Sequence, residues 1–271
     1  MRRCRFPWGG FLILFGVLFL LSNVLPFQFS VWNAFVPLLI IWWGLRLLAG
    51  GESRPLPRPH TANKQQTGEV KYLSLPIKQV EEAHIRLKHG GGKLEIHGET
   101  APDELLAGTF GARGVAYRME TAVGDVLHLD MQSPLSLAEQ AEEQDWVFGL
   151  NQEIPMSLNV STAATQAALD LSALQLTEIR LHSGANDLTV ILPAQARYTL
   201  VQVESGAAAI RLYVPEGVAA HIRPREGLAA VQVDEGRFPP VGRVYESEDY
   251  DEAEHRVDIY INAGTSNISI Q

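Results

Sequence analysis

Cysteine is almost absent from this chain, since Cys4 is the only one among its 271 residues. A single thiol forms no intrachain disulfide and builds no cysteine-based zinc site. The chain also lacks a phosphate-binding loop, a Gly-x-Ser-x-Gly elbow, a His-Glu-x-x-His pair and a dinucleotide-binding fingerprint. His84, His89 and His97 lie near two early strands, where exposed strand faces explain them more simply than a metal site. We therefore expect a protein that is not an enzyme and that holds neither a cofactor nor a metal.

Acidic residues are absent from the first fifty positions, which contain four arginines and carry a formal charge of +4. All 31 acidic residues and the other 18 basic residues follow, so the rest of the chain is near −13. An acidic domain is a poor partner for nucleic acid and for anionic lipid headgroups. We expect this part of the chain to bind neither.

Two apolar stretches, Trp8 to Leu25 and Val31 to Ala49, fill this acid-free segment. A helix that crosses a bilayer needs about 20 apolar residues, with a range of roughly 17 to 25. The connection from Pro26 to Ser30 is short and uncharged, as suits a turn between two spans. The alternative is a cleaved signal peptide, but no small-x-small cleavage site follows and a second span begins almost at once. Residues 1–50 are therefore predicted to form a transmembrane helical hairpin.

Basic residues flank the hairpin on its two outer ends, and the connection between the spans has none. The positive-inside rule then places both termini in the cytoplasm, and tryptophans near span ends favour the membrane interface. We expect a multi-pass protein of the cell membrane with cytoplasmic N- and C-termini. The residues predicted at the interface are Arg2, Arg3, Arg5, Trp8, Trp32, Trp42, Trp43 and Arg46.

Residues 51–69 are predicted to be a proline-rich linker, and residues 70–271 an all-β domain that could divide into parts 70–132 and 146–271. Apolar residues alternate with polar ones in short runs after residue 70, as in Ile85 and Leu87 or Leu188 and Val190. A period of two between Gly, Pro, Ser and Asn indicates half-buried strands. The segment Ser136 to Asp145 could be a capped helix or a polar loop.

A repeat runs through this domain, in which an apolar pair follows a glycine after four and six residues. The spacing between Gly184 and Gly206 is 22 residues and the next spacing is 21, which suits one coil of a β-solenoid. A twisted antiparallel β-sandwich is the alternative. Glycine at such a turn predicts a positive φ. The predicted repeat turns are Gly90, Gly184, Gly206, Gly227 and Gly264.

An acidic run lies between the last two of these glycines and lengthens their spacing to 37 residues. It lacks the glycine and the spacing of a calcium-binding loop. A solvated loop is the simplest interpretation, and contact with a basic surface of a partner is the alternative. The run consists of Glu246, Glu248, Asp249, Asp251, Glu252 and Glu254.

The order of several short segments resembles a known family. Trp is followed by Ile-Pro, Leu-Asp-Leu-Ser, a Gly-Ala turn and a strand that ends in Pro, at Trp146, Ile154-Pro155, Leu169 to Ser172, Gly184-Ala185 and Leu188 to Pro193. This series is similar to the C-terminal region of LiaF-type cell-envelope stress proteins and their toast-rack relatives. The hairpin, in particular Gly10 to Gly16 and Val36 to Gly44, resembles their N-terminal transmembrane region.

The resemblance implies a membrane-anchored regulator that restrains a membrane protein partner, the sensor kinase of a two-component system in bacterial cell-envelope stress signalling. From the residues alone, an envelope-facing structural or adhesin-like β-solenoid remains the alternative. That alternative needs the β-domain outside the cell, whereas the arginine distribution favours the cytoplasm.

Overall fold

The computed structural model describes residues 66–271 except 78–79, 112–113, 123, 134–143 and 226–228. Every regular element in this described part is a strand, so the all-β prediction for the domain is confirmed. The strands are β1 (Gln66–Val70), β2 (Tyr72–Pro76), β3 (Glu82–His97), β4 (Glu104–Phe110), β5 (Val115–Thr121), β6 (Val126–Gln132), β7 (Trp146–Leu150), β8 (Met156–Asp170), β9 (Leu176–Ser183), β10 (Asp187–Ile191), β11 (Tyr198–Ser205), β12 (Ala209–Tyr213), β13 (Val218–Pro224), β14 (Ala230–Val233), β15 (Pro240–Val241), β16 (Val244–Glu246), β17 (His255–Ala263) and β18 (Asn267–Ile270).

The alternation of the sequence is what buries one side of each strand. In β9, Ile179 and Leu181 are at most 1% exposed, while Arg180 between them points outward. Successive side chains of a strand point to opposite faces, so each apolar pair enters the core and each polar neighbour meets solvent. The same apolar pairs line the interior from β3 to β18 and form one continuous core cluster.

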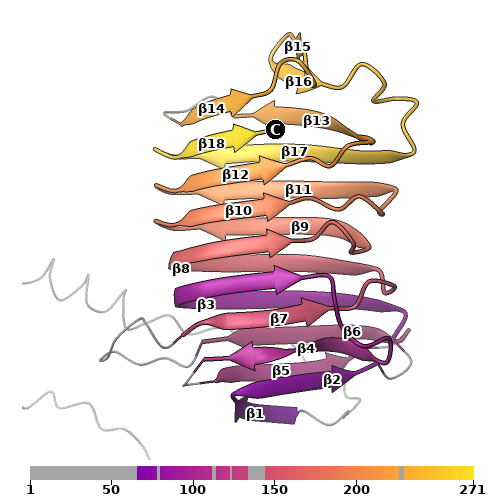
Figure 1. Cartoon of the computed structure of the whole chain (residues 1–271), viewed down its shortest axis with the longest axis vertical. Helices are drawn as coiled ribbons and strands as arrows, with labels where there is room; N and C mark the ends of the chain where they lie inside the picture. The colour runs from indigo at the N-terminus through magenta and orange to yellow at the C-terminus, as the bar shows by residue number, and fades with distance from the viewer. Residues whose placement is uncertain (1–65, 78–79, 112–113, 123, 134–143, 226–228) are drawn as a thin grey trace, which may run out of the picture. The chain divides into compact units, whose positions relative to one another are not determined.

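The strands form two facing sheets that share β3 and β8 (Figure 1). The first half of β8 pairs with β9 and its second half with β10, so this long strand continues from one sheet into the other. The first sheet runs β1-β5-β6-β3-β8-β9-β11-β17-β13-β16-β15. The second runs β2-β4-β7-β3-β8-β10-β12-β18-β14.

Strand direction differs between the middle and the ends of this stack. From β6 and β7 to β13 and β14 all neighbours are parallel, and β9 and β11 pair with a constant offset of 22 residues, as in Ile179 opposite Val201. The strands added at the β1 end of both sheets, and those added beyond β13 in the first sheet, are antiparallel. The middle of the stack therefore has the parallel pairing expected of a β-solenoid, whereas the added strands have the antiparallel pairing expected of a β-sandwich.

The spatial order of the last strands differs from their chain order. We define a rung as two consecutive strands, one in each sheet. The rung β17–β18 inserts between β11–β12 and β13–β14, so that Ile268 lies opposite both Ile210 and Val231 (Figure 1). Gly264 consequently stacks against Gly206, although the sequence repeat places Gly227 between them. The apolar register is conserved in this rearrangement because every rung presents the same pair of inward residues.

The predicted positive φ at the repeat glycines is wrong for the residues described. Gly184, Gly206 and Gly264 are all outside the left-handed region, which holds Gly92, Gly111, Gly114, Gly124, Gly217 and Gly242 instead. A Cβ on Gly184 would lie 2.9 Å from the carbonyl oxygen of Ala163, and one on Gly264 would lie 2.8 Å from that of Gly206. These glycines are needed because the backbones of successive rungs approach closely at the bend.

The two remaining repeat glycines fall elsewhere. Gly90 lies inside β3, with open space around the position of a Cβ, and is not a turn. Gly227 lies outside the described residues, as do residues 1–65 with the predicted hairpin, and residues 134–143 of the helix or loop candidate. Among the residues that are described, no helix has the length and hydropathy to cross a membrane.

Candidate functional site

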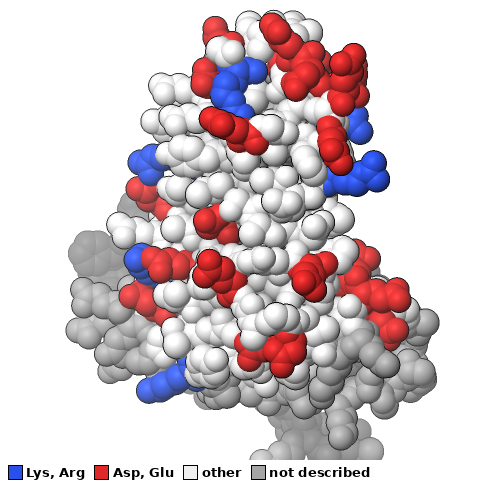
Figure 2. Space-filling view, turned by 45° about the vertical axis from the view of Figure 1, so that its right-hand side comes forward, with Lys and Arg blue, Asp and Glu red and all other residues white. Residues whose placement is uncertain are grey.

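Acidic side chains gather at the end of the stack opposite β1, around the connection from β16 to β17 (Figure 2). Five carboxylates of the predicted acidic run are exposed there, and none has an ion-pair partner among the described residues. We call these five residues the acidic tip: Glu248, Asp249, Asp251, Glu252 and Glu254. Five exposed carboxylates within seven residues give this loop a negative potential, so a cationic surface would be attracted to the tip.

The loop that carries the acidic tip is anchored to the neighbouring rungs. Ser247 is 8% exposed, its Oγ accepts from the amide of Ala220 at 2.9 Å, and its amide donates to the Ala220 carbonyl at 3.0 Å. The backbone then turns, with the amide of Glu252 donating to the carbonyl of Asp249. The tip is therefore held in place by the fold and does not depend on its own charges.

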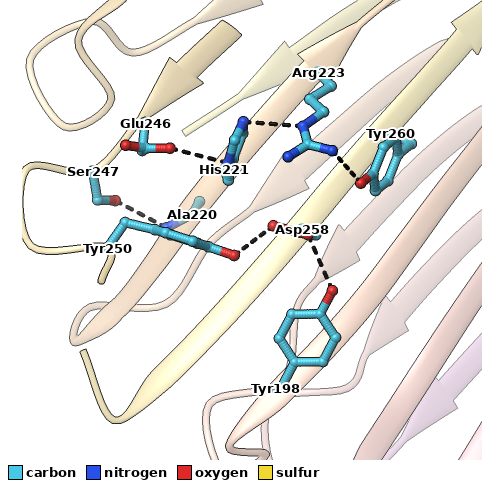
Figure 3. A network of polar contacts seen from close by, with 9 residues as sticks. All are labelled: Tyr198, Ala220, His221, Arg223, Glu246, Ser247, Tyr250, Asp258 and Tyr260. Atoms are coloured by element: carbon cyan, nitrogen blue, oxygen red, sulfur yellow. Dashed lines mark hydrogen bonds and ion pairs between the residues drawn. The ribbon is translucent and has the colours of Figure 1, made fainter. Parts of the chain in front are cut away.

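Glu246, the remaining acidic residue of the run, belongs to a separate chain of contacts. It lies on β16, and its Oε2 is 3.0 Å from Nδ1 of His221 on β13 (Figure 3). The guanidinium Nε of Arg223 donates to Nε2 of the same imidazole at 3.0 Å, and Nη1 of Arg223 donates to the hydroxyl of Tyr260. Because Nε2 accepts, the proton of a neutral His221 is on Nδ1 and is donated to Glu246.

Asp258 forms the centre of the second half of this network. Its carboxylate accepts hydrogen bonds from Tyr198 on β11, at 3.0 Å, and from Tyr250 in the acidic loop (Figure 3). Burial, reinforced by the hydrogen bond to Asp258, raises the pKa of both phenols. Both phenols therefore stay protonated at physiological pH and act as hydrogen-bond donors.

The composition of this surface suits contact with another protein. The tyrosine–arginine patch, which we define as Tyr198, Arg223, Tyr250 and Tyr260, spans β11, β17, β13 and the acidic loop (Figure 3). Arg223 packs over the ring of Tyr260 at 5.0 Å and has no carboxylate partner among the described residues. Tyrosine and arginine dominate the energetics of protein interfaces, whereas this patch presents no nucleophile paired with a base. The arrangement therefore suits binding.

A shallow hollow lies beside the acidic tip. Its lining comes from the turn after β14 and from the acidic loop, namely Glu235, Gly236, Arg237, Pro239, Glu248 and Asp249. The guanidinium of Arg237 is engaged by the carbonyls of Val214 and Pro215, at 2.7 and 3.1 Å. The carboxylates of Glu235, Glu248 and Asp249 have no ion-pair partner in the part of the chain that the structure describes.

The three histidines that the sequence places near two early strands, His84, His89 and His97, do not form a metal-binding cluster. His84 points outward, stacks on His128 with 5.0 Å between ring centroids and contacts Ser157. His89 is 2% exposed, lies 4.9 Å from the ring of Trp146 and contacts the Gln144 carbonyl through Nε2. Within the described residues, no group of three metal-ligating side chains is close enough to hold an ion.

Sequence reasoning found the acidic run but missed the tyrosine–arginine patch. Alternation marks His221, Arg223, Asp258 and Tyr260 as outward positions of two strands. Their meeting depends on β17 lying between β11 and β13, which the chain order does not suggest. The predicted membrane-interface residues lie outside the described part of the chain.

Two protein-family models match this chain, one in each part. Residues 61–213 match the family described as the N-terminal domain of toast_rack. Residues 2–56 match the LiaF transmembrane domain. No curated protein matches this chain.

Comparison with solved structures matches proteins from two bacteria. A "putative cell adhesion protein" from Clostridium sporogenes ATCC 15579 has a TM-score of 0.65 and 20% identity, over 76% of this chain and 99% of that one. At this identity the likeness concerns the fold alone. A "putative adhesin" from Bacteroides fragilis NCTC 9343 has a TM-score of 0.26 and 8% identity, over 78% of this chain and 98% of that one, which is too low to support an argument.

Proposed function

The chain belongs to the toast_rack family and carries a LiaF transmembrane domain at its N-terminus, and from this combination we propose that it is a membrane-anchored, non-enzymatic regulator. Its proposed partner is a membrane protein, the sensor kinase of a two-component system that responds to cell-envelope stress. The anchor confines the β-domain to the neighbourhood of proteins in the same membrane, and for short flexible tethers such confinement gives effective concentrations of about a millimolar.

The proposed topology has two spans and both termini in the cytoplasm, where the signalling parts of sensor kinases act. It is supported by the arginines before and after the apolar stretches and by their absence from residues 26–30. Reporter fusions at Ser30 and at Gln271 should give opposite signals. An extracytoplasmic signal at Gln271 would contradict the proposal.

The observation that carries the proposed binding role is the joint position of the acidic tip and the tyrosine–arginine patch. Both lie at the end of the stack away from β1, the most N-terminal strand that the structure describes (Figure 1). From β1 to β13 the first sheet has eight strand-to-strand steps, or roughly 40 Å at the usual spacing. The proposed binding surface is thus well separated from β1, the strand that begins the described domain, which suits contact with a partner domain outside the bilayer.

Site-specific photocrosslinking in native membranes tests this role. A photoreactive residue at Asp251 or Glu252 should capture a sensor kinase, identified by mass spectrometry. The same residue at Glu99 or Asp103, exposed acidic positions in the connection from β3 to β4, is the matched control. Equal capture from both ends, or a captured set without a kinase, would contradict the proposed function.

The second candidate is an envelope-facing, adhesin-like protein. It is favoured by the fold that this chain shares with the Clostridium sporogenes protein, which is itself described as a "putative cell adhesion protein". This candidate requires residues 66–271 outside the cell, so the fusion at Gln271 separates the two functions in one experiment.

A further inference from the structure

Strand β14 leaves one edge of the second sheet open. Among the described residues it pairs only with β18. The amides of Ala230 and Asp234 donate to the carbonyls of Ser266 and Ile270, toward β18. In a parallel pair, alternate residues face opposite sides, so the amides and carbonyls of Val231 and Val233 point away from β18. No described residue bonds to these two amides.

The side chains of this strand also have incomplete cover. Val231 and Val233 are half-buried, whereas Ile268 and Ile270, which lie opposite them on β18, are at most 1% exposed. The other sheet is different at this end, because the antiparallel strands β15 and β16 cover the edge of β13. The strand itself, Ala-Val-Gln-Val, contains no charge and no proline. Natural edge strands usually carry such residues to prevent strand addition.

Charge near the open edge indicates what kind of strand would fit. The turn after β14 leads into the hollow, whose lining includes three carboxylates without ion-pair partners in the described part of the chain, those of Glu235, Glu248 and Asp249. The one cation in the lining, Arg237, donates to the carbonyls of Val214 and Pro215, so the hollow keeps a net negative charge. A second copy of this chain would bring two such acidic surfaces together and is disfavoured. A lysine or arginine side chain at this place would be attracted by the net negative charge of three carboxylates and one guanidinium.

We propose that β14 binds an extended segment of the partner protein by strand addition, with a lysine or arginine of that segment in the acidic hollow. Main-chain hydrogen bonds to Val231 and Val233 supply affinity, and the basic side chain supplies selectivity. This inference rests on the proposed function in placing the partner at the tip, and it adds the mode of binding and the chemistry of the bound segment.

The test uses the full-length protein in nanodiscs and a fluorescent synthetic peptide of alternating valine and threonine with lysines at both ends. Anisotropy should report binding that is lost when alternate peptide amides are N-methylated and weakened about tenfold when the lysines are replaced by glutamates. Absence of binding by the lysine peptide, or binding that is indifferent to N-methylation, would overturn strand addition.

Two variants of the protein locate the site. Val231→Pro removes an outward amide while leaving the ladder to β18, since edge strands tolerate proline where the amide faces solvent. It should abolish binding, with folding checked by circular dichroism. Combined Glu235→Gln, Glu248→Gln and Asp249→Asn should weaken binding of the lysine peptide but not of an otherwise identical serine peptide. Unchanged binding in Val231→Pro, or a dimer of the wild-type protein that Val231→Pro dissociates, would refute the proposed occupant.

These outcomes separate the two proposals. If photocrosslinking captures the kinase from the tip but Val231→Pro captures it equally well, strand addition fails and the regulatory function stands. If Gln271 lies outside the cell while the lysine peptide still binds at β14, the regulatory function fails and strand addition stands.

Discussion

Alanine substitution of the three bend glycines should produce effects that differ in a defined order. A Cβ on Gly264 or Gly184 would lie 2.8 or 2.9 Å from a backbone carbonyl oxygen of the next rung, whereas one on Gly206 would lie 3.4 Å away. Backbone atoms that are hydrogen-bonded in a parallel ladder have little freedom to move. Alanine at Gly184 or Gly264 therefore requires a local shift of the neighbouring rungs. Overpacking of this kind costs typically 1–3 kcal/mol. At Gly206 the added methyl meets ordinary contact, and reduced unfolded-state entropy favours alanine by about 0.4–1 kcal/mol.

For a domain of this size, 1 kcal/mol shifts the melting temperature by about 2–4 °C. Gly184→Ala and Gly264→Ala should therefore melt about 2–12 °C below the wild type, and Gly206→Ala should melt at or slightly above it. Thermal unfolding followed by far-UV circular dichroism measures all three, with Gly206→Ala as the matched control. Equal melting in the three variants, or the largest loss at Gly206, would refute close approach of the rungs as the reason for glycine.

Three further predictions follow from the same structure. Burial lowers the pKa of His89 below its ordinary value of about 6.5, so the folded state binds fewer protons than the unfolded state and the free energy of unfolding falls as the pH drops through that range. Between pH 7.5 and 5.5, the free energy of unfolding measured in urea titrations should fall by up to about 1.4 kcal/mol less in His89→Gln than in the wild type. An identical fall in both proteins would count against this assignment. Residues 66–271, which include β1 paired with β5, should fold without the hairpin and give a sheet spectrum, which a helix-dominated circular dichroism spectrum would disprove. Amide replacement of the acidic tip should weaken partner capture most at low salt, whereas the same replacement of Glu81, Glu99, Asp103, Asp125 and Glu153, which are equally exposed carboxylates, should not.

The strands and their buried sides were predictable because period-two alternation is a local property. Pairs such as Ile179 and Leu181 face the core as the pattern requires. The repeat was also visible, since Gly184 and Gly206 recur with a constant offset to their apolar pairs. Its cause was misjudged, because a glycine can be needed either for positive φ or for lack of a side chain, and a single sequence does not distinguish the two.

The candidate site was less predictable because it is non-local. The acidic tip is contiguous in sequence, and charge alone identifies it. The tyrosine–arginine patch brings together Tyr198 of β11 and Tyr260 of β17, two strands that pair with an offset of 58 residues. Its arginine, Arg223, comes from β13, which pairs with the other edge of β17. Every rung has the same inward pattern, so apolar periodicity gives no preference for one order of rungs over another.

Inhibition of the captured sensor kinase in proteoliposomes tests the central claim most directly. The full-length protein should lower kinase autophosphorylation, and the fragment 51–271 at the same bulk concentration should lower it far less, because it lacks the effective concentration of about a millimolar that the tether supplies. The full-length protein with an amidated acidic tip should also inhibit weakly, although it remains folded and anchored. Equal inhibition by the soluble fragment, or full inhibition by the amidated protein, would contradict a tethered regulator that acts through this surface.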